Sequence, residues 1–345
     1  MYHRTASCTR FALYISYLQF YVLLLKEVRF MWQHLTEDAY NEFLLSFNLL
    51  KTKDIRRYKN TLYYLSNNID GNYVEYEISK KNGKIRTIYE PSPILKLVQR
   101  NILHNILEEK RISEYAKAYQ KNISLLENAL PHVKQNIILK LDIMNFFDNI
   151  TFKMVYNSCF REELYPKSIG VLLTNLCTYQ GKLPQGAPTS SYISNIILRG
   201  FDEIIGKYCS NRNINYTRYS DDLTFSGDFQ PKEIILLLKE ELKKRGFKLN
   251  YDKIHIITKN KRQTVTGIVV NDKINVTKEY KRKIRQEMYY IRKYGFDEHL
   301  KFLKIDNKEK YINNLIGRIN YCLQINKSDK FKEYIQYLKN QININ

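Results

Sequence analysis

Residues 216–226 have the sequence Tyr-Thr-Arg-Tyr-Ser-Asp-Asp-Leu-Thr-Phe-Ser. The β-branched and aromatic residues on either side of a short polar centre predict two strands joined by a tight turn, with Asp221 and Asp222 at its tip. Two neighbouring carboxylates repel each other, so this turn favours a divalent cation or open solvent beside it. Aspartate is also common in ordinary turns, where it makes local hydrogen bonds. This stretch alone leaves both a metal site and a plain acidic turn open.

A second acidic position follows an apolar run. Residues 137–148 have the sequence Ile-Ile-Leu-Lys-Leu-Asp-Ile-Met-Asn-Phe-Phe-Asp, which starts as a run of strand length and places Asp142 at or near its end. A strand end can present a carboxylate into a cleft. Three carboxylates from two strands could hold two Mg²⁺ ions about 3.5–4 Å apart, which stabilise the attacking and leaving oxygens of a phosphoryl displacement. The two stretches together predict polymerase chemistry.

Several segments, in this order along the chain, resemble the motifs of a known family. Residues 141–147, residues 183–190 (Leu-Pro-Gln-Gly-Ala-Pro-Thr-Ser) and residues 219–222 (Tyr-Ser-Asp-Asp) resemble the first palm motif, the nucleotide-pocket motif and the Tyr-x-Asp-Asp box of reverse transcriptases. Residues 128–132 (Asn-Ala-Leu-Pro-His) and 265–267 (Val-Thr-Gly) resemble two elements of the bacterial retron branch. The resemblance extends over roughly residues 35–325.

The resemblance implies an α/β (α+β) fold of the right-hand polymerase type, with fingers, an antiparallel-sheet palm and a helical thumb. We expect an apolar N-terminal extension at 1–30, fingers and N-terminal helices at 31–136, a palm with interleaved fingers elements at 137–276 and the thumb at 277–345. The implied function is an RNA-directed DNA polymerase of a retron, which makes RNA-linked single-stranded DNA (msDNA) from a cognate structured noncoding RNA and takes part in antiviral (antiphage) defence.

The same resemblance assigns expected site residues. The catalytic and metal-binding group is Asp142, Asp221 and Asp222, with the carbonyl of Ile143, and the implied cofactor is a pair of Mg²⁺ ions that Mn²⁺ could replace. The nucleotide-binding group is Arg86, Phe147 as a steric gate against a ribose 2′-OH, Gln185, Gly186 and Lys253. The nucleic-acid-binding group is Lys96, Arg100, Asn128, His132, Thr266, Gly267, Lys281, Arg282 and Arg318.

Several of these residues also have simpler interpretations. Residues 73–89 predict a hairpin around Lys-Asn-Gly that carries Lys80, Lys81, Lys84 and Arg86, and a solvated charged ribbon would look the same. His132 has the pattern of a structural histidine, so a contact with RNA and a scaffold role both stay open. The segment 264–271 is predicted as a strand in which Gly267 lets nucleic acid approach. A basic helical run such as residues 277–287 is often just a solvated face.

The charge of the chain favours a polyanionic partner. Lys and Arg number 56 against 35 Asp and Glu, a net charge of +21, and 29 tyrosines and 16 phenylalanines lie among the basic residues. This combination suits phosphate contacts beside base stacking, although a ribosomal or membrane-surface protein could share the charge. The five cysteines form no C-x-x-C pair, which indicates a reducing compartment and no zinc site.

The N-terminal stretch is the most apolar part of the chain. Residues 11–25 follow Arg4 and Arg10, are short for a membrane span and lack a small-x-small cleavage site after them. A helix packed on the body is one interpretation; we prefer Met31 as the functional start, because a globular pattern begins there. We therefore expect a cytoplasmic protein with no membrane partner.

The expected partners are the noncoding RNA as template and primer, its DNA product, dNTPs, an accessory effector protein and a host RNase H, since 345 residues leave no room for a nuclease domain. Three alternatives remain at this level: a group II intron type of reverse transcriptase, another defence reverse transcriptase, and a noncatalytic RNA-binding relative. The three aspartates argue against the last of these.

Overall fold

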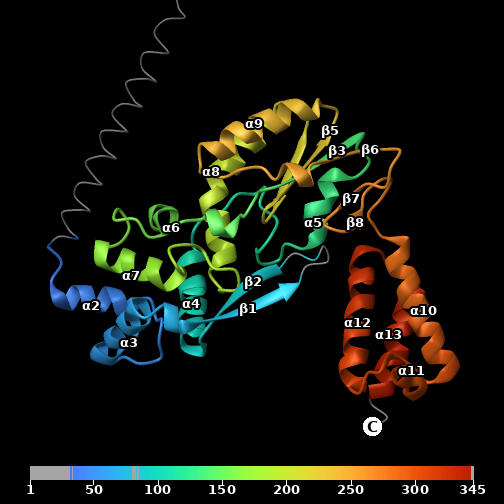
Figure 1. The fold of residues 1–345 in the computed structure, drawn as a ribbon, viewed down its shortest axis with the longest axis horizontal. Helices are drawn as coiled ribbons and strands as arrows, with labels where there is room; N and C mark the ends of the chain where they lie inside the picture. The colour runs from blue at the N-terminus through green and yellow to red at the C-terminus, as the bar shows by residue number, and fades with distance from the viewer. Residues whose placement is uncertain (1–31, 33, 80–82, 84, 343–345) are drawn as a thin grey trace, which may run out of the picture. The chain divides into compact units, whose positions relative to one another are not determined.

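The computed structural model describes residue 32, residues 34–79, residue 83 and residues 85–342 (Figure 1). The chain divides into two compact units, each built from separate segments. The described part of the first unit lies within residues 1–114, 144–203 and 244–247, and that of the second within residues 115–143, 204–243 and 248–345. The apolar stretch 11–25 and Met31 lie outside the described residues. None of the described helices combines the length and hydropathy that crossing a membrane requires.

Helices form most of the first unit. Two of them begin at a clear capping signal: Asp54 accepts hydrogen bonds from the amides of Arg56 and Arg57, and Ser92 precedes a proline at the first position of the next helix. Their buried faces carry leucines such as Leu62 and Leu95. The helices are α2 (Glu37–Ser46), α3 (Ile55–Asn67), α4 (Pro93–Ile102), which continues as a π-helical turn (Leu103–Leu107), α6 (Phe152–Cys159), α7 (Lys167–Cys177) and the first part of α8 (Ser190–Ser210).

The hairpin of the first unit has the predicted strands. β1 (Tyr73–Ser79) pairs antiparallel with β2 (Ile85–Pro91), from Tyr73 opposite Pro91 to Ser79 opposite Ile85. Lys80, Lys81 and Lys84 lie outside the described residues. The amide of Tyr89 on β2 donates to the carbonyl of Gln185 at 2.7 Å, which ties the hairpin to the segment before α8.

An antiparallel sheet is the centre of the second unit. Its strand order is β4 (Asn215–Tyr219), β5 (Asp222–Gly227), β3 (Ile137–Asp142) and β6 (His255–Thr258). The apolar run of β3 is buried because neighbours pair on both of its edges. The β4–β5 hairpin is the one that residues 216–226 predict. After β5, the chain forms the amphipathic helix α9 (Pro231–Lys243).

A smaller sheet packs beside the buried face of β3. It consists of β7 (Thr264–Val265), β8 (Ile268–Val269) and β9 (Asn275–Val276). Val265 and Ile268 share a core with Ile138 of β3 and Ala129 of α5 (Leu125–Ala129). The prediction of one continuous strand over 264–271 is wrong. Thr266 and Gly267, with φ of 45° and 84°, form a two-residue turn of type I′ character between β7 and β8.

A helical bundle closes the chain, with its helices gathered together at the red end in Figure 1. Thr277 caps α10 (Lys278–Tyr294), which α11 (Phe296–Leu303), α12 (Lys308–Ile325) and α13 (Asp329–Ile342) follow. Ile284, Met288 and Ile291 of α10 form one core with residues of α12 and α13, including Ile319 and Leu338. Mixed helices and antiparallel sheets are therefore the observed fold class, as predicted from the sequence.

Candidate functional site

Strand pairing brings two of the predicted aspartates together. Asp142 is the last residue of β3 and Asp222 the first of β5, and they are paired directly across the two strands. Asp142 keeps only 5% of its surface exposed. The apolar residues of β3 fix its register through burial, so a shift by one residue would turn Asp142 to the opposite face of the sheet.

The turn between β4 and β5 holds Asp221 from several sides. Ser220 has a φ of 62°, a left-handed conformation that costs energy for any residue with a Cβ. The guanidinium of the fully buried Arg218 donates to the carbonyl of Ser220 at 3.1 Å. The amide of Ile143 donates to the carbonyl of Asp221 at 3.0 Å. The turn that carries the carboxylates is therefore fixed by neighbouring backbone and by a buried cation.

A tyrosine that the sequence did not single out also reaches this turn. The hydroxyl of Tyr119 donates to Oγ of Ser220 at 3.3 Å, and its ring lies 6.4 Å from the ring of Tyr219. Desolvation raises the pKa of Asp221, and the hydrogen bond of the Ser220 hydroxyl to its carboxylate is a smaller contribution that opposes this rise. No local pattern could reveal this contact, because 101 residues separate its partners.

The carboxylates repel one another in the free protein. Desolvation and the charge of Asp142 raise the pKa of Asp221 above its ordinary value. The pKa of Asp222 rises to about 6, first through desolvation and then through the charges of Asp221 and Asp142, although Asp222 retains exposed surface. Negative charge is therefore crowded at this end of the sheet, which favours binding of a cation.

Lys253 supplies one positive charge at the same place. Its Nζ lies 2.6 Å from Oδ2 of Asp142, and the side-chain amide of Asn250 donates to Oδ1 at 3.2 Å. Partial desolvation lowers the pKa of Lys253, but the hydrogen bond and charge of Asp142 outweigh it and leave the pKa above its ordinary value. The predicted nucleotide-binding lysine thus contacts a predicted catalytic aspartate directly.

The three aspartates have suitable chemistry for Mg²⁺ but are not gathered around one point. Within the described ranges, no group of three or more His, Cys, Asp or Glu side chains is arranged to hold a metal ion. The ammonium of Lys253 lies beside Asp142 in this group, 2.6 Å from its carboxylate. Carboxylates and the nearby Ile143 carbonyl are the hard oxygen donors that Mg²⁺ prefers, so the donor set fits the ion.

The other predicted nucleotide-binding residues belong to the first unit. Arg86 is exposed on β2, and Phe147 is partly exposed with its ring edge-on to Phe146 at 5.2 Å. Gln185 and Gly186 lie in the turn that binds β2. A Cβ on Gly186, whose φ is 124°, would stand 2.6 Å from the carbonyl oxygen of Tyr89. The need for glycine at this position therefore comes from β2, whatever else approaches it.

The two retron-type elements meet inside the second unit. His132 is fully buried, and its Nδ1 lies 2.7 Å from Oγ of Ser226 on β5, while Nε2 lies 2.9 Å from Oγ1 of Thr217 on β4. Burial lowers its pKa to about 3, so the ring is neutral. Asn128 donates to Oγ1 of Thr266 at 3.4 Å. Through these contacts, His132 and Asn128 hold neighbouring segments together in the interior. Among the residues that we assigned to nucleic-acid binding in these two elements, Thr266 and Gly267 are at least partly exposed.

The remaining residues predicted to bind nucleic acid differ in whether another side chain of the protein already contacts them. Arg100 and Arg282 are exposed, on α4 and α10. Lys96 pairs with Glu90 at 2.8 Å, and Lys281 donates to Oδ1 of Asn275. Arg318 forms two hydrogen bonds of 2.8 Å with Glu287. Contacts of these residues with nucleic acid stay predictions, and the exposed pair is freest to make them.

Comparisons with known proteins identify the family of this chain. The family model described as reverse transcriptase (RNA-dependent DNA polymerase) matches residues 78–279. The Retron Ec86 reverse transcriptase of Escherichia coli is 34% identical over 236 residues, 67% of this chain and 73% of its own. The Retron Ec83 reverse transcriptase of the same species is 30% identical over 271 residues, 73% of this chain and 83% of its own.

A more distant organism and a solved structure give further matches. The Retron Mx162 reverse transcriptase of Myxococcus xanthus is 33% identical over 229 residues, 58% of this chain and 47% of its own. A structure of a foamy viral protease-reverse transcriptase with double-stranded DNA aligns with a TM-score of 0.46 and 17% identity, over 80% of this chain and 42% of its own. On the sequence matches, the chain belongs to the reverse transcriptase family, as a retron reverse transcriptase and thus an RNA-directed DNA polymerase.

Proposed function

We propose that this enzyme makes RNA-linked single-stranded DNA from a cognate structured noncoding RNA, with Asp142, Asp221 and Asp222 as its catalytic residues. The observation that carries the proposal is the pairing of β3 with the β4–β5 hairpin. This pairing sets the three aspartates and Lys253 at one end of one sheet. Acidic residues at the paired ends of buried strands suit phosphoryl transfer, which depends mainly on positioning and electrostatics.

The three aspartates and the carbonyl of Ile143 would hold the metal ions, two Mg²⁺ or in their place Mn²⁺. When bound, these ions supply the positive charge that activates the primer hydroxyl and neutralises the departing pyrophosphate. Lys253, whose Nζ contacts Asp142, would donate a proton to the departing pyrophosphate. Arg218 and Ile143 keep the turn of Asp221 in place throughout.

The first unit would bind the incoming dNTP. Arg86 carries a planar guanidinium that can pair with two phosphate oxygens, and its exposure on β2 leaves it free to do so. Phe147 would exclude a ribose 2′-OH, while Gln185 and Gly186 shape the pocket. In this proposal residues 31–136 are fingers, residues 137–276 the palm with fingers elements, and residues 277–345 the thumb.

The proposed RNA and DNA contacts use the surface residues of the assigned set: Lys96, Arg100, Thr266, Gly267, Lys281, Arg282 and, if its pair with Glu287 opens, Arg318. His132 and Asn128 would support this surface from inside, because both are buried and hydrogen-bonded. The cellular role we propose is antiphage defence by a cytoplasmic enzyme that works with an accessory effector protein, with host RNase H removing template.

The test is to express the gene with its upstream noncoding region and to extract nucleic acid. We expect a short DNA attached to RNA, whose mobility changes on debranching, and its absence with Asp221→Asn/Asp222→Asn. As a matched control, Asp228→Asn changes a carboxylate at the other end of β5 and should leave the product intact. Extension of a primer on RNA without any RNA-attached DNA would refute the proposed product while leaving the polymerase activity in place.

A further inference from the structure

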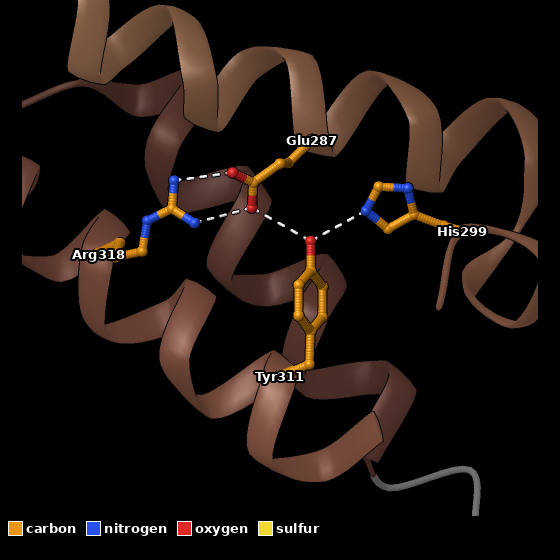
Figure 2. A network of polar contacts seen from close by, with 4 residues as sticks. All are labelled: Glu287, His299, Tyr311 and Arg318. Atoms are coloured by element: carbon orange, nitrogen blue, oxygen red, sulfur yellow. Dashed lines mark hydrogen bonds and ion pairs between the residues drawn. The ribbon is translucent and has the colours of Figure 1, made fainter. Parts of the chain in front are cut away.

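Four polar side chains join three helices of the bundle (Figure 2). Glu287 of α10 accepts two hydrogen bonds of 2.8 Å from Arg318 of α12, and one of 3.1 Å from the hydroxyl of Tyr311, also on α12. A carboxylate can only accept, so the hydroxyl proton of Tyr311 is committed to Glu287. The oxygen of Tyr311 must then accept from Nε2 of His299 on α11, at 2.9 Å.

This network fixes the ring of His299. Its proton sits on Nε2, and burial lowers the pKa of the ring, so His299 is neutral near physiological pH. An ion pair at one end of the network and a buried ring at the other leave little freedom for the side chains between them. The network therefore holds the His299 ring in one orientation, so that the ring can form a fixed wall.

That wall bounds a cavity of about 650 Å³. Three residues of α10 and three of α11 line it: Gln286, Tyr290, Tyr294, Glu298, His299 and Phe302. The ring of Tyr290 is nearly parallel to the rings of Tyr294 and His299, with centroids 6.3 Å apart and interplanar angles of 26° and 22°. The volume lies within the range of small-molecule sites, and flat rings dominate the lining.

The aromatic side chains of this cavity are open to solvent. Phe302 is 83% exposed, Tyr294 56% and Tyr290 38%. Single exposed apolar side chains are ordinary, but several large rings around one hollow mark a binding surface. The occupant must supply a flat apolar face, because flat faces are what the lining presents.

The charge around the cavity selects the kind of occupant. Helix α10 carries seven basic residues against two acidic ones, as Lys278, Lys281, Arg282, Lys283, Arg285, Arg292 and Lys293 against Glu279 and Glu287. Two of the seven, Arg285 and Arg292, lie over rings of α13, and Glu298 of the lining pairs with Lys301 at 2.9 Å. The ammonium of Lys293 lies over the rings of Tyr289 and Tyr294, at 5.6 and 5.1 Å. A flat ring joined to a phosphate matches aromatic walls under a cationic helix better than an apolar peptide does.

We propose that this cavity binds one unpaired nucleobase of a bound nucleic acid strand. Tyr290, Tyr294 and Phe302 stack against the base, and Lys293 lies near its phosphate. Gln286 offers a donor and an acceptor to the base edge, while the carboxylate of Glu298 only accepts. Bases with an exocyclic amino group, namely adenine, guanine and cytosine, therefore fit better than uracil or thymine. This inference rests on the proposed binding of a structured RNA and adds a base contact to it.

The test uses the full-length enzyme and fluorescent duplexes that differ by one bulged adenosine. Base–aromatic stacking predicts that the bulged RNA duplex binds the native enzyme roughly 5- to 100-fold more tightly than the perfect duplex. Phe302→Ala and Tyr294→Ala should remove this difference and leave binding of the perfect duplex unchanged. Tyr64→Ala, at an exposed tyrosine of α3, is the matched control that should change neither. Fluorescence anisotropy gives the dissociation constants of the native enzyme and of all three variants.

Further arms of the experiment decide the remaining points. A bulged uridine should bind less tightly than adenosine, and Glu298→Gln should narrow that gap. The same duplexes made of DNA show whether template or product supplies the base.

Equal binding of bulged and perfect duplexes, or equal losses for both in the variants, would overturn the inference. Because Phe302 is exposed, its alanine variant tests the site even if Tyr294→Ala fails to fold. Primer extension by the same variants separates this result from failure of the proposed function.

Discussion

Ser220 holds a conformation that its side chain disfavours, next to a carboxylate of the candidate site. Two contacts compensate, one from Arg218 to its carbonyl and one from Tyr119 to its hydroxyl. The Tyr-x-Asp-Asp box that residues 219–222 resemble leaves the position of Ser220 open, so the hydroxyl contact is a feature of this chain beyond the motif. At the residue scale, this contact links an exposed tyrosine to the position of Asp221.

We expect Tyr119→Phe and Ser220→Ala each to lower kcat by about three- to tenfold, the value of one hydrogen bond that helps to orient Asp221. Because Tyr119 acts through the Ser220 hydroxyl, the double variant should be no slower than Ser220→Ala alone. Steady-state primer extension on an RNA template measures kcat and KM separately. Ser191→Ala is the control for loss of a serine hydroxyl elsewhere. Additive losses in the double variant would show that the two residues act independently.

His132 predicts a specific pH dependence of stability. Its pKa is about 3 in the folded protein against an ordinary value of 6.5, so only the unfolded chain takes up this proton between those values. The free energy of unfolding should therefore be highest above pH 6.5 and fall as the pH drops towards 3. Between pH 8 and pH 5 this residue alone should contribute a loss of about 2 kcal/mol.

Urea unfolding of the native chain and of His132→Asn, each at pH 8 and pH 5, measures that contribution as a difference of differences. The variant should be less stable at pH 8, because Ser226 and Thr217 lose their partner, but it should lose about 2 kcal/mol less on acidification. His255→Asn, at an exposed histidine of β6, should behave like the native chain. An unchanged pH dependence in His132→Asn would contradict a neutral buried ring.

Residue roles were predictable from sequence only where the pattern is local. The paired Asp221 and Asp222 lie within a hairpin whose strands and turn are visible in residues 216–226 alone. The sequence left a scaffold role for His132 open, but its partners were not predictable, because Thr217 and Ser226 are 85 and 94 residues away along the chain. The side-chain hydrogen bond of Asn128 with Thr266 spans 138 residues and was hidden for the same reason.

At the scale of elements, the turn before α8 has the sharpest steric requirement. Gly186→Ala would place a methyl group 2.6 Å from the carbonyl oxygen of Tyr89, in addition to the strain of a φ of 124°. Gly181→Ala is a matched control in the same segment: its φ of 71° is also strained for alanine, but nothing lies within 4 Å of the added atom.

We therefore expect Gly181→Ala to lower the free energy of unfolding by about 1–2 kcal/mol, from backbone strain alone, and Gly186→Ala to lower it further through displacement of β2. Because β2 also carries Arg86, the second variant should raise KM for dNTP as well. Denaturation curves and dNTP titrations of primer extension measure the two effects. Similar losses in the free energy of unfolding of both variants would mean that β2 can move away from the added methyl group without further destabilisation.

Elements are predictable where turn signals flank a clear period. Both the β1–β2 and β4–β5 hairpins follow from alternation around a short polar turn. The prediction of one strand over 264–271 fails because its residues, Thr266 included, are mostly β-branched and suit a strand, while Thr266 adopts a φ of 45° that β-branched residues disfavour. Gly267 is the available signal, because its φ of 84° is that of a turn residue; its contact with nucleic acid stays a prediction.

At the scale of the whole molecule, composition indicated a polyanionic partner and the motifs indicated the family, which the comparisons confirm. The division of the chain into two compact units was not predictable from the sequence. Each compact unit draws on segments separated by more than one intervening stretch, and such long-range grouping leaves no periodic trace in the sequence. The predicted boundaries of fingers, palm and thumb accordingly remain predictions.

The ion pair of Asp142 with Lys253 bears on the stability of the whole molecule. Asp142 is buried, and an unpaired buried carboxylate is strongly destabilising. We expect a chelator to abolish activity while leaving the melting temperature of the native enzyme within about 2 °C, since Lys253 still faces Asp142. In Lys253→Met the melting temperature should instead fall on chelation and recover with Mg²⁺. Lys248→Met, a nearby exposed lysine, is the control, and differential scanning fluorimetry measures all three.

A melting temperature of Lys253→Met that ignores both chelator and Mg²⁺ would show that Asp142 tolerates its burial alone. If the melting temperature of Lys253→Met does respond, Lys253 is the counter-ion of Asp142 in the metal-free enzyme. A polymerase built in this way can be purified, frozen and stored without metal and still regain activity on addition of Mg²⁺, because the lysine keeps its acidic centre folded in the interval.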